Sequence, residues 1–203
     1  TSEFGHPSPV QKLAEQLGIS LEIIDLSETF ENEVVQYFVK AYQSGQTPNP
    51  CMVCNERIKF GPLLRRAETL GASHLATGHY ARIAADANGR LSLLKGVDPI
   101  KEQSYFLSRL TQSELKKALF PLGRFTKDQA REMARSWQLE SIHGRESQEL
   151  CFVEDDNYKQ FLSLRGGLPS KPGPIVTTDG RALGHHQGLH NYTVGQRRGI
   201  NVP

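Results

Sequence analysis

Cysteine, long apolar runs and excess charge are all scarce in this chain, and each scarcity excludes a class of protein. Three cysteines among 203 residues do not suit the disulfide framework of a small secreted domain. No apolar run approaches the roughly 20 residues that span a bilayer, and the opening TSEFGHPSPV lacks the basic and apolar regions of a signal peptide. We therefore expect a cytoplasmic protein without a membrane partner.

The net charge of +2 is small, so bulk electrostatics does not indicate a nucleic-acid binder. Local pairs such as Arg65 with Arg66 and Arg197 with Arg198 would suit contacts with phosphates. Solvated helix faces explain such pairs more simply. Charge alone therefore leaves the class of ligand open.

What the chain does contain is an alternation of helix-like and strand-like segments. Apolar spacing and cap residues predict a helix over 9–18 with Gly18 as C-cap, a buried strand over 21–26, a helix over 28–43 capped by Ser27, a helix from about 56 to 70, and a strand over 74–83. This order favours an α/β fold with a parallel sheet. A doubly wound sheet normally opens on a strand and a phosphate-binding turn, so we expect a Rossmann-like domain that is incomplete at its N-terminus.

Local signals continue along the second half of the chain. They are capping boxes at Thr111/Glu114 and Thr126/Gln129, and hairpin turns in ADANGR and at Asp179-Gly180. Glycine and proline then become frequent, and helical periodicity ends. We place an α/β nucleotide-binding domain over 1–166 and a small β-rich domain over 167–203.

The stretch TPNPCMVCN carries Cys51 and Cys54 in a Cys-x-x-Cys spacing, just before a predicted helix. Near a helix N-terminus the pKa of a thiol is lowered, so Cys54 can be an activated thiolate. A zinc site needs four ligands, and the sequence has no second Cys-x-x-Cys. A reactive pair, as in a thioredoxin-like reductase, and a pair of buried small residues both stay open.

Three further places could carry chemistry. Cys151 has apolar neighbours, which are typical of a buried strand, but beside a reactive Cys54 it becomes a candidate second thiol. Gly78 ends the strand predicted in ATGHYAR, at the edge where α/β folds bind ligands, and His79 beside it can donate to a phosphate or base. A satisfied strand-end histidine fits equally well. Lys101 and Gln103 in KEQSYFL could contact RNA.

Taken together, the order of these strings resembles the tRNA-specific 2-thiouridylases (the MnmA/TrmU family). The matching strings run from about Leu13 onward and include GQTPNPCMVCNERIKF, ATGHYAR, KEQSYFL, LFPLG, SQELCFVED, GLPSKPGPIVTTDGRALGHHQGL and YTVGQRRG. Their length and collinear order exclude chance agreement. The resemblance implies a Rossmann-like domain of the adenine nucleotide alpha hydrolase-like, PP-loop type, followed by a small β-rich central domain.

The activity that the resemblance implies is that of a tRNA-uridine 2-sulfurtransferase, which thiolates the wobble uridine at C2. ATP with Mg²⁺ would adenylate the C2 carbonyl oxygen and make it a leaving group. A cysteine persulfide, charged by a sulfur-relay donor protein, would then deliver sulfur to C2. A soft thiolate nucleophile suits this step.

The resemblance also implies roles for individual residues. Cys151 would hold the persulfide, Cys54 would be the partner thiol, and a Cys54–Cys151 disulfide would form as the thiolated base is released. The other implied positions are Gly78 for ATP, Asn49, Pro50 and Cys51 for the target base, and His79, Lys101, Glu102 and Gln103 for tRNA.

Departures from the family pattern open alternatives. The SGGVDS-type pyrophosphate loop and the family's C-terminal β-barrel are absent from this sequence, so we expect the fragment alone to be inactive, or to act as a binding-only tRNA adaptor. Many members have Asp where this chain has Cys51. With Cys54 and Cys151 it would give three thiolates that can hold a [4Fe-4S] cluster. The persulfide route is the preferred prediction, without a metal, and the cluster is its rival.

Overall fold

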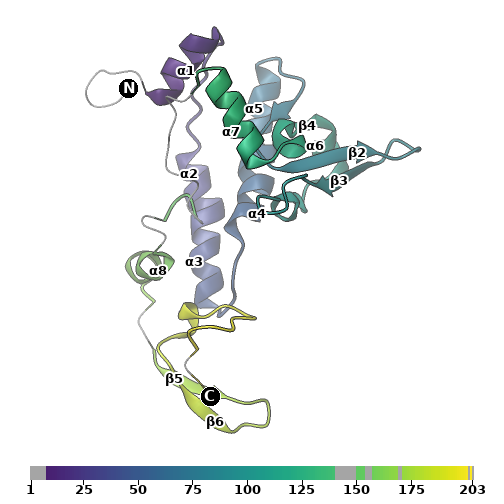
Figure 1. Ribbon diagram of the computed structural model, residues 1–203. Helices are drawn as coiled ribbons and strands as arrows, with labels where there is room; N and C mark the ends of the chain where they lie inside the picture. The colour runs from purple at the N-terminus through teal and green to yellow at the C-terminus, as the bar shows by residue number, and fades with distance from the viewer. Residues whose placement is uncertain (1–7, 140–149, 154–156, 169–170, 201, 203) are drawn as a thin grey trace. The chain divides into compact units, whose positions relative to one another are not determined.

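The computed structural model describes residues 8–139, 150–153, 157–168, 171–200 and 202 (Figure 1). It divides into two compact units. Unit 1 comprises residues 1–27 and 54–146, and unit 2 comprises residues 28–53 and 147–203. No helix in the described ranges is long and apolar enough to cross a membrane.

Unit 1 combines helices with short paired strands. Its elements are α1 (Pro9–Leu17), η2 (Asn55–Leu63), α5 (Leu64–Thr69), β1 (Leu75–Ala76), β2 (Ala81–Ala85), β3 (Leu91–Lys95), η3 (Ser104–Leu107), α6 (Gln112–Lys117), β4 (Ala118–Leu119), η4 (Pro121–Arg124) and α7 (Lys127–Ser136). β1 pairs with β4 in parallel, and β2 pairs with β3 in an antiparallel hairpin. Figure 1 shows this hairpin extending outward from α6 and β4.

The core of unit 1 forms where the helix made by η2 and α5 packs on these strands. Its buried members are Phe60, Leu64, Ala81, Leu107 and Ala118. Burying a large apolar side chain of this kind stabilises the fold by roughly 1.5–3 kcal/mol. The sequence thus places its apolar residues where helix and strands meet.

Gly123 explains how closely η4 approaches β2. A Cβ atom at this position would lie 1.7 Å from the carbonyl oxygen of Ala81, so no larger residue fits without a backbone shift. The backbone of Gly123 also accepts a hydrogen bond from the N–H of Val97 at 3.1 Å. Glycine therefore fixes the segment 118–124 directly against the hairpin.

Unit 2 is organised around one long helix. Its elements are α2 (Ser27–Phe30), η1 (Glu31–Val35), α3 (Gln36–Gln43), α4 (Pro50–Cys54), α8 (Tyr158–Gly166), β5 (Gly173–Val176), β6 (Ala182–His186) and η7 (Leu189–Asn191). The first residue of α2, Ser27, and the last residue of α4, Cys54, belong to unit 1. α2, η1 and α3 run on without interruption, and η1 is a π-helical segment. Phe38, Val39 and Tyr42 of α3 form the core with Leu162 of α8. β5 and β6 form an antiparallel hairpin.

Several predicted elements are confirmed. α1 ends at Gly18, which has a left-handed φ of 64°. Both capping boxes are present, with the Thr111 and Thr126 side chains accepting hydrogen bonds from backbone N–H groups three residues on. Both predicted hairpins form, and Gly180 supplies the positive φ of 88° that the second turn needs.

The buried strand predicted over 21–26 is wrong. The described strands pair as β1–β4, β2–β3 and β5–β6, so none of them takes the backbone hydrogen bonds of this segment. Ile23 is 74% exposed. An apolar segment becomes a strand only beside a partner strand. The cap of the next helix also differs, because Asp25 Oδ1 accepts the N–H of Ser27 at 2.9 Å and Ser27 is itself helical.

Two further boundaries differ from the prediction. The helix expected from about residue 56 begins at Pro50, where α4 leads into η2 and α5. The strand expected over 74–83 is two strands, β1 and β2, separated by residues 77–80. α8 ends at Gly166, and the division into domains 1–166 and 167–203 stays a prediction.

Candidate functional site

The helix that carries Cys51 and Cys54 starts with strong local signals. Asn49 Oδ1 accepts the backbone N–H of Met52 at 3.2 Å, and Pro50 occupies the first helical position, where its missing N–H has no cost. Cys51 and Cys54 follow in the first two turns, and both are partly buried. Residues three apart share one side of a helix, so the Cys-x-x-Cys spacing presents the two thiols in the same direction.

Asn55 follows Cys54 directly and is 2% exposed. Its Nδ2 donates to the carbonyl of Phe106 at 3.0 Å, and its Oδ1 is buried without a partner in the described part of the chain. The helix continues from Asn55 as the π-helical segment η2, with non-helical φ and ψ at Gly61 beside Pro62. Sequence reasoning missed Asn55. The sequence signal that could have drawn attention to Asn55 is its position directly after Cys54.

Cys151 is exposed on a turn, not buried in a strand as its neighbours suggested. The turn closes with a hydrogen bond from Val153 N–H to the Leu150 carbonyl at 3.1 Å. Val153 is 1% exposed, and the Phe152 ring packs edge-on against Phe38 at a centroid distance of 5.4 Å. The apolar neighbours of Cys151 therefore anchor the turn, and the thiol projects from it.

Gly78 and His79 lie between β1 and β2. Gly78 is exposed just beyond the carboxyl end of β1, and a Cβ atom there would find only the Leu122 side chain, at 3.8 Å. His79 is 8% exposed, and its Nδ1 lies 2.8 Å from Thr77 Oγ1. Burial, with a smaller contribution from the Lys59 charge, lowers the pKa of His79 to about 4. His79 is therefore neutral at pH 7 and can offer a hydrogen bond rather than a charge.

Lys101, Glu102 and Gln103 approach the same segment from the loop before η3. Gln103 Oε1 accepts the N–H of Tyr80 at 3.1 Å, and its own N–H donates to the Tyr80 carbonyl at 3.0 Å. Glu102 Oε1 accepts the N–H of Ser104, and Lys101 is exposed. Gln103 is thus hydrogen-bonded to Tyr80, the residue that follows His79. The structure therefore brings Gln103 and His79, both predicted from the sequence, close together.

Asp98 holds this loop to α7 and was missed by sequence reasoning. Its Oδ1 accepts the N–H groups of Ile100 and Lys101, at 2.8 and 3.0 Å, and its Oδ2 accepts that of Lys127 at 2.8 Å. These hydrogen bonds, that of Lys127 first, lower the pKa of Asp98. An Asp followed by Pro is typical of such a turn, so this dipeptide is the sequence signal that indicates the role of Asp98.

The predicted site residues are divided between the units. Cys54, Gly78, His79, Lys101, Glu102 and Gln103 belong to unit 1, and Asn49, Pro50, Cys51 and Cys151 belong to unit 2. Within the described ranges, no three His, Cys, Asp or Glu side chains form a group that could hold a metal ion.

Comparison with known proteins matches the chain to two family models. The tRNA methyl transferase HUP domain matches residues 6–155, and the tRNA methyl transferase PRC-barrel domain matches residues 159–203. The HUP domain is a Rossmann-like α/β domain, so the predicted fold class, with a second, smaller domain, is confirmed.

Several curated relatives are about half identical to this chain over the aligned residues. A protein of Syntrophus aciditrophicus (strain SB) named tRNA-specific 2-thiouridylase MnmA 2 is 48% identical over 191 residues, covering 93% of this chain and 56% of the relative. Proteins named tRNA-specific 2-thiouridylase MnmA from Carboxydothermus hydrogenoformans and Desulfosudis oleivorans are 47% and 49% identical, over 95% and 96% of this chain and 53% and 54% of their own lengths. The chain spans about half the length of these relatives. It belongs to the family of the tRNA methyl transferase HUP and PRC-barrel domains, and the resemblance to the tRNA-specific 2-thiouridylases (MnmA) is confirmed.

Proposed function

We propose that the protein to which this chain belongs is an ATP-dependent tRNA sulfurtransferase that thiolates C2 of the wobble uridine. Family membership and the names of the relatives support tRNA thiolation as the reaction class. The observation that carries the sulfur step is the exposed Cys151 on a turn anchored by Phe152 and Val153. A thiol that must be charged by another protein needs such exposure.

The thiol chemistry of the proposal needs two cysteines. Cys151 receives a sulfur atom from a persulfide donor protein and carries it as a persulfide. The terminal sulfur attacks C2 of the activated base, and the activated oxygen leaves. Cys54 then attacks the Cys151 sulfur, which breaks the bond to the transferred sulfur and leaves 2-thiouridine and a Cys54–Cys151 disulfide. An external thiol reductant restores both thiols. The pairing of these two residues rests on the resemblance.

ATP fits the surroundings of Gly78. This residue is exposed just beyond the carboxyl end of β1, where a side chain would meet only an ordinary contact with Leu122, and nucleotides bind α/β sheets at this edge. When bound there with Mg²⁺, ATP would supply the adenylyl group that makes the C2 oxygen a leaving group. Asn49, Pro50 and Cys51 would contact the base, and His79, Lys101, Glu102 and Gln103 the rest of the tRNA.

Two rivals make different predictions. A [4Fe-4S] cluster held by Cys51, Cys54 and Cys151 would make Cys51 essential, and Cys51 does lie one helical turn from Cys54. A binding-only adaptor would bind tRNA without thiolating it. Methyl transfer, which the family description names, has no support in the sequence, since it contains no Gly-rich methyl-donor motif.

The test measures 2-thiouridine in tRNA from cells that lack their own thiolase and carry the full-length gene. Wild type should restore thiolation, Cys54→Ser and Cys151→Ser should abolish it, and Cys51→Ser should retain it. Loss in all three variants, together with iron and sulfide in anaerobically purified protein, would favour the cluster. Well-expressed wild type that binds tRNA without thiolating it would favour the adaptor.

A further inference from the structure

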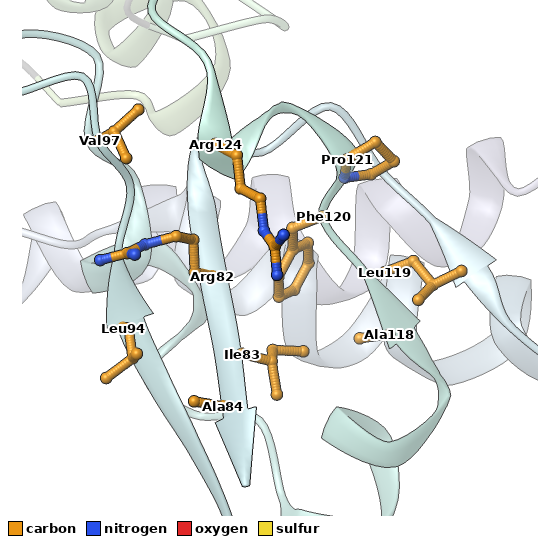
Figure 2. Close-up of a pocket in the computed structure, with 10 residues that line it drawn as sticks. All are labelled: Arg82, Ile83, Ala84, Leu94, Val97, Ala118, Leu119, Phe120, Pro121 and Arg124. Atoms are coloured by element: carbon orange, nitrogen blue, oxygen red, sulfur yellow. The ribbon is translucent and has the colours of Figure 1, made fainter.

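A pocket of unit 1 is lined by residues to which no role has yet been given. It has a volume of about 740 Å³ and lies between the β2–β3 hairpin and the segment 118–124 (Figure 2). That volume is within the range of small-molecule sites. Two strings of the resemblance contribute to its walls, ATGHYAR with Arg82 and LFPLG with Phe120.

The pocket gathers apolar side chains that are exposed. Leu94, Val97 and Leu119, which are 37%, 45% and 47% exposed, all line it. Exposed apolar groups that cluster around one hollow mark a binding surface more often than scattered ones do. The Phe120 ring and Ile83 continue this apolar wall.

Two arginines give the pocket its charge. Within the described part of the chain, no acidic side chain lines it. Arg82 donates its Nε–H to the carbonyl of Lys95 at 2.9 Å, which holds the guanidinium near β3. Arg124 extends from η4 toward Phe120 (Figure 2), and no described residue forms an ion pair or hydrogen bond with its side chain. Guanidinium groups bind carboxylates and phosphates in bidentate fashion, and RNA supplies a phosphate at every nucleotide.

The pocket adjoins the residues proposed to contact tRNA. The Phe120 ring, which lines the pocket, lies edge-on to the His79 ring at a centroid distance of 6.0 Å. Arg82 follows Tyr80, which Gln103 fastens, by two residues. Gly123 holds Arg124 and its segment against β2, since a Cβ there would meet the Ala81 carbonyl. The pocket therefore lies beside His79 and Gln103, two of the residues proposed to contact tRNA.

We infer that this pocket takes one unstacked nucleotide of the tRNA substrate, distinct from the thiolated base; the inference rests on the proposed function. The phosphate would lie at Arg124 and Arg82, and the base against Phe120, Leu119 and Ile83. Single-stranded RNA loops offer such unstacked bases, and apolar or aromatic walls bind them.

The test uses the full-length protein and measures tRNA affinity over a series of salt concentrations. Arg124→Gln should weaken binding severalfold and reduce the slope of log affinity against log salt by about 0.7, the value for one phosphate on a single strand. Arg90→Gln, in the exposed hairpin turn, is the matched control with the same change in charge. Leu119→Glu should also weaken binding, whereas Leu70→Glu, at another exposed leucine of unit 1, should not.

The outcomes separate this inference from the proposed function. If wild type binds and thiolates tRNA, but Arg124→Gln and Leu119→Glu match their controls, the pocket inference is wrong and the function stands. If Arg124→Gln raises the KM for ATP and leaves tRNA binding unchanged, the occupant is a free nucleotide and the inference is again wrong. If wild type binds no tRNA, the proposed function fails as well.

Discussion

His79 should make the stability of unit 1 depend on pH in a defined direction. Burial lowers its pKa from 6.5 to about 4, so between these values the unfolded chain binds a proton that the folded chain does not. The free energy of unfolding must therefore fall as the pH drops from about 7 to 4. The full difference in pKa corresponds to about 3 kcal/mol, or about 2 kcal/mol after allowance for residual solvent at the ring.

The assay is urea denaturation at several pH values, followed by the fluorescence of Trp137, the single tryptophan of the chain. His79→Gln keeps a polar partner for Thr77 but does not titrate, so its stability should vary less with pH than that of wild type by about 2 kcal/mol. His74→Gln, at an exposed position, is the control and should keep the wild-type profile. Identical profiles for wild type and His79→Gln would refute the reasoning.

Three other substitutions test the packing that positions the site. Gly123→Ala should destabilise unit 1 by about 1–3 kcal/mol in urea denaturation, because the new Cβ would lie 1.7 Å from the Ala81 oxygen; wild-type stability would contradict this. Gly78→Ala meets only an ordinary contact and should leave stability within about 0.5 kcal/mol, while the KM for ATP rises if the nucleotide binds there. Asn55→Ala removes the donor of the partly buried Phe106 carbonyl and should cost about 1 kcal/mol, whereas an unchanged urea midpoint would show that water replaces the amide.

Elements with local causes were predictable from the sequence. The capping boxes at Thr111 and Thr126 and the turn at Gly180 depend on residues within a few positions of one another, and propensity describes such interactions well. The Asn49–Pro50 cap was equally local. The helix expected from about residue 56 left this cap out, although it begins at Pro50.

Features that depend on distant partners were not predictable. The segment 21–26 has strand-like composition but no partner among the described strands. Cys151 has the neighbours of a core residue, yet the contacts of Phe152 and Val153 turn the thiol outward. The burial of His79 likewise depends on packing against Phe120 from a distant segment. Periodicity records which residues are apolar, and tertiary packing decides which way each one points.

The central claim is that Cys151 carries the sulfur that reaches tRNA. The most direct measurement is mass spectrometry of the full-length protein after incubation with a persulfide donor, before and after addition of ATP and unmodified tRNA. The account predicts one additional sulfur atom on the peptide that contains Cys151, its loss as 2-thiouridine forms, and neither event in Cys151→Ser. Formation of 2-thiouridine by Cys151→Ser, or transfer without any sulfur on Cys151, would contradict it.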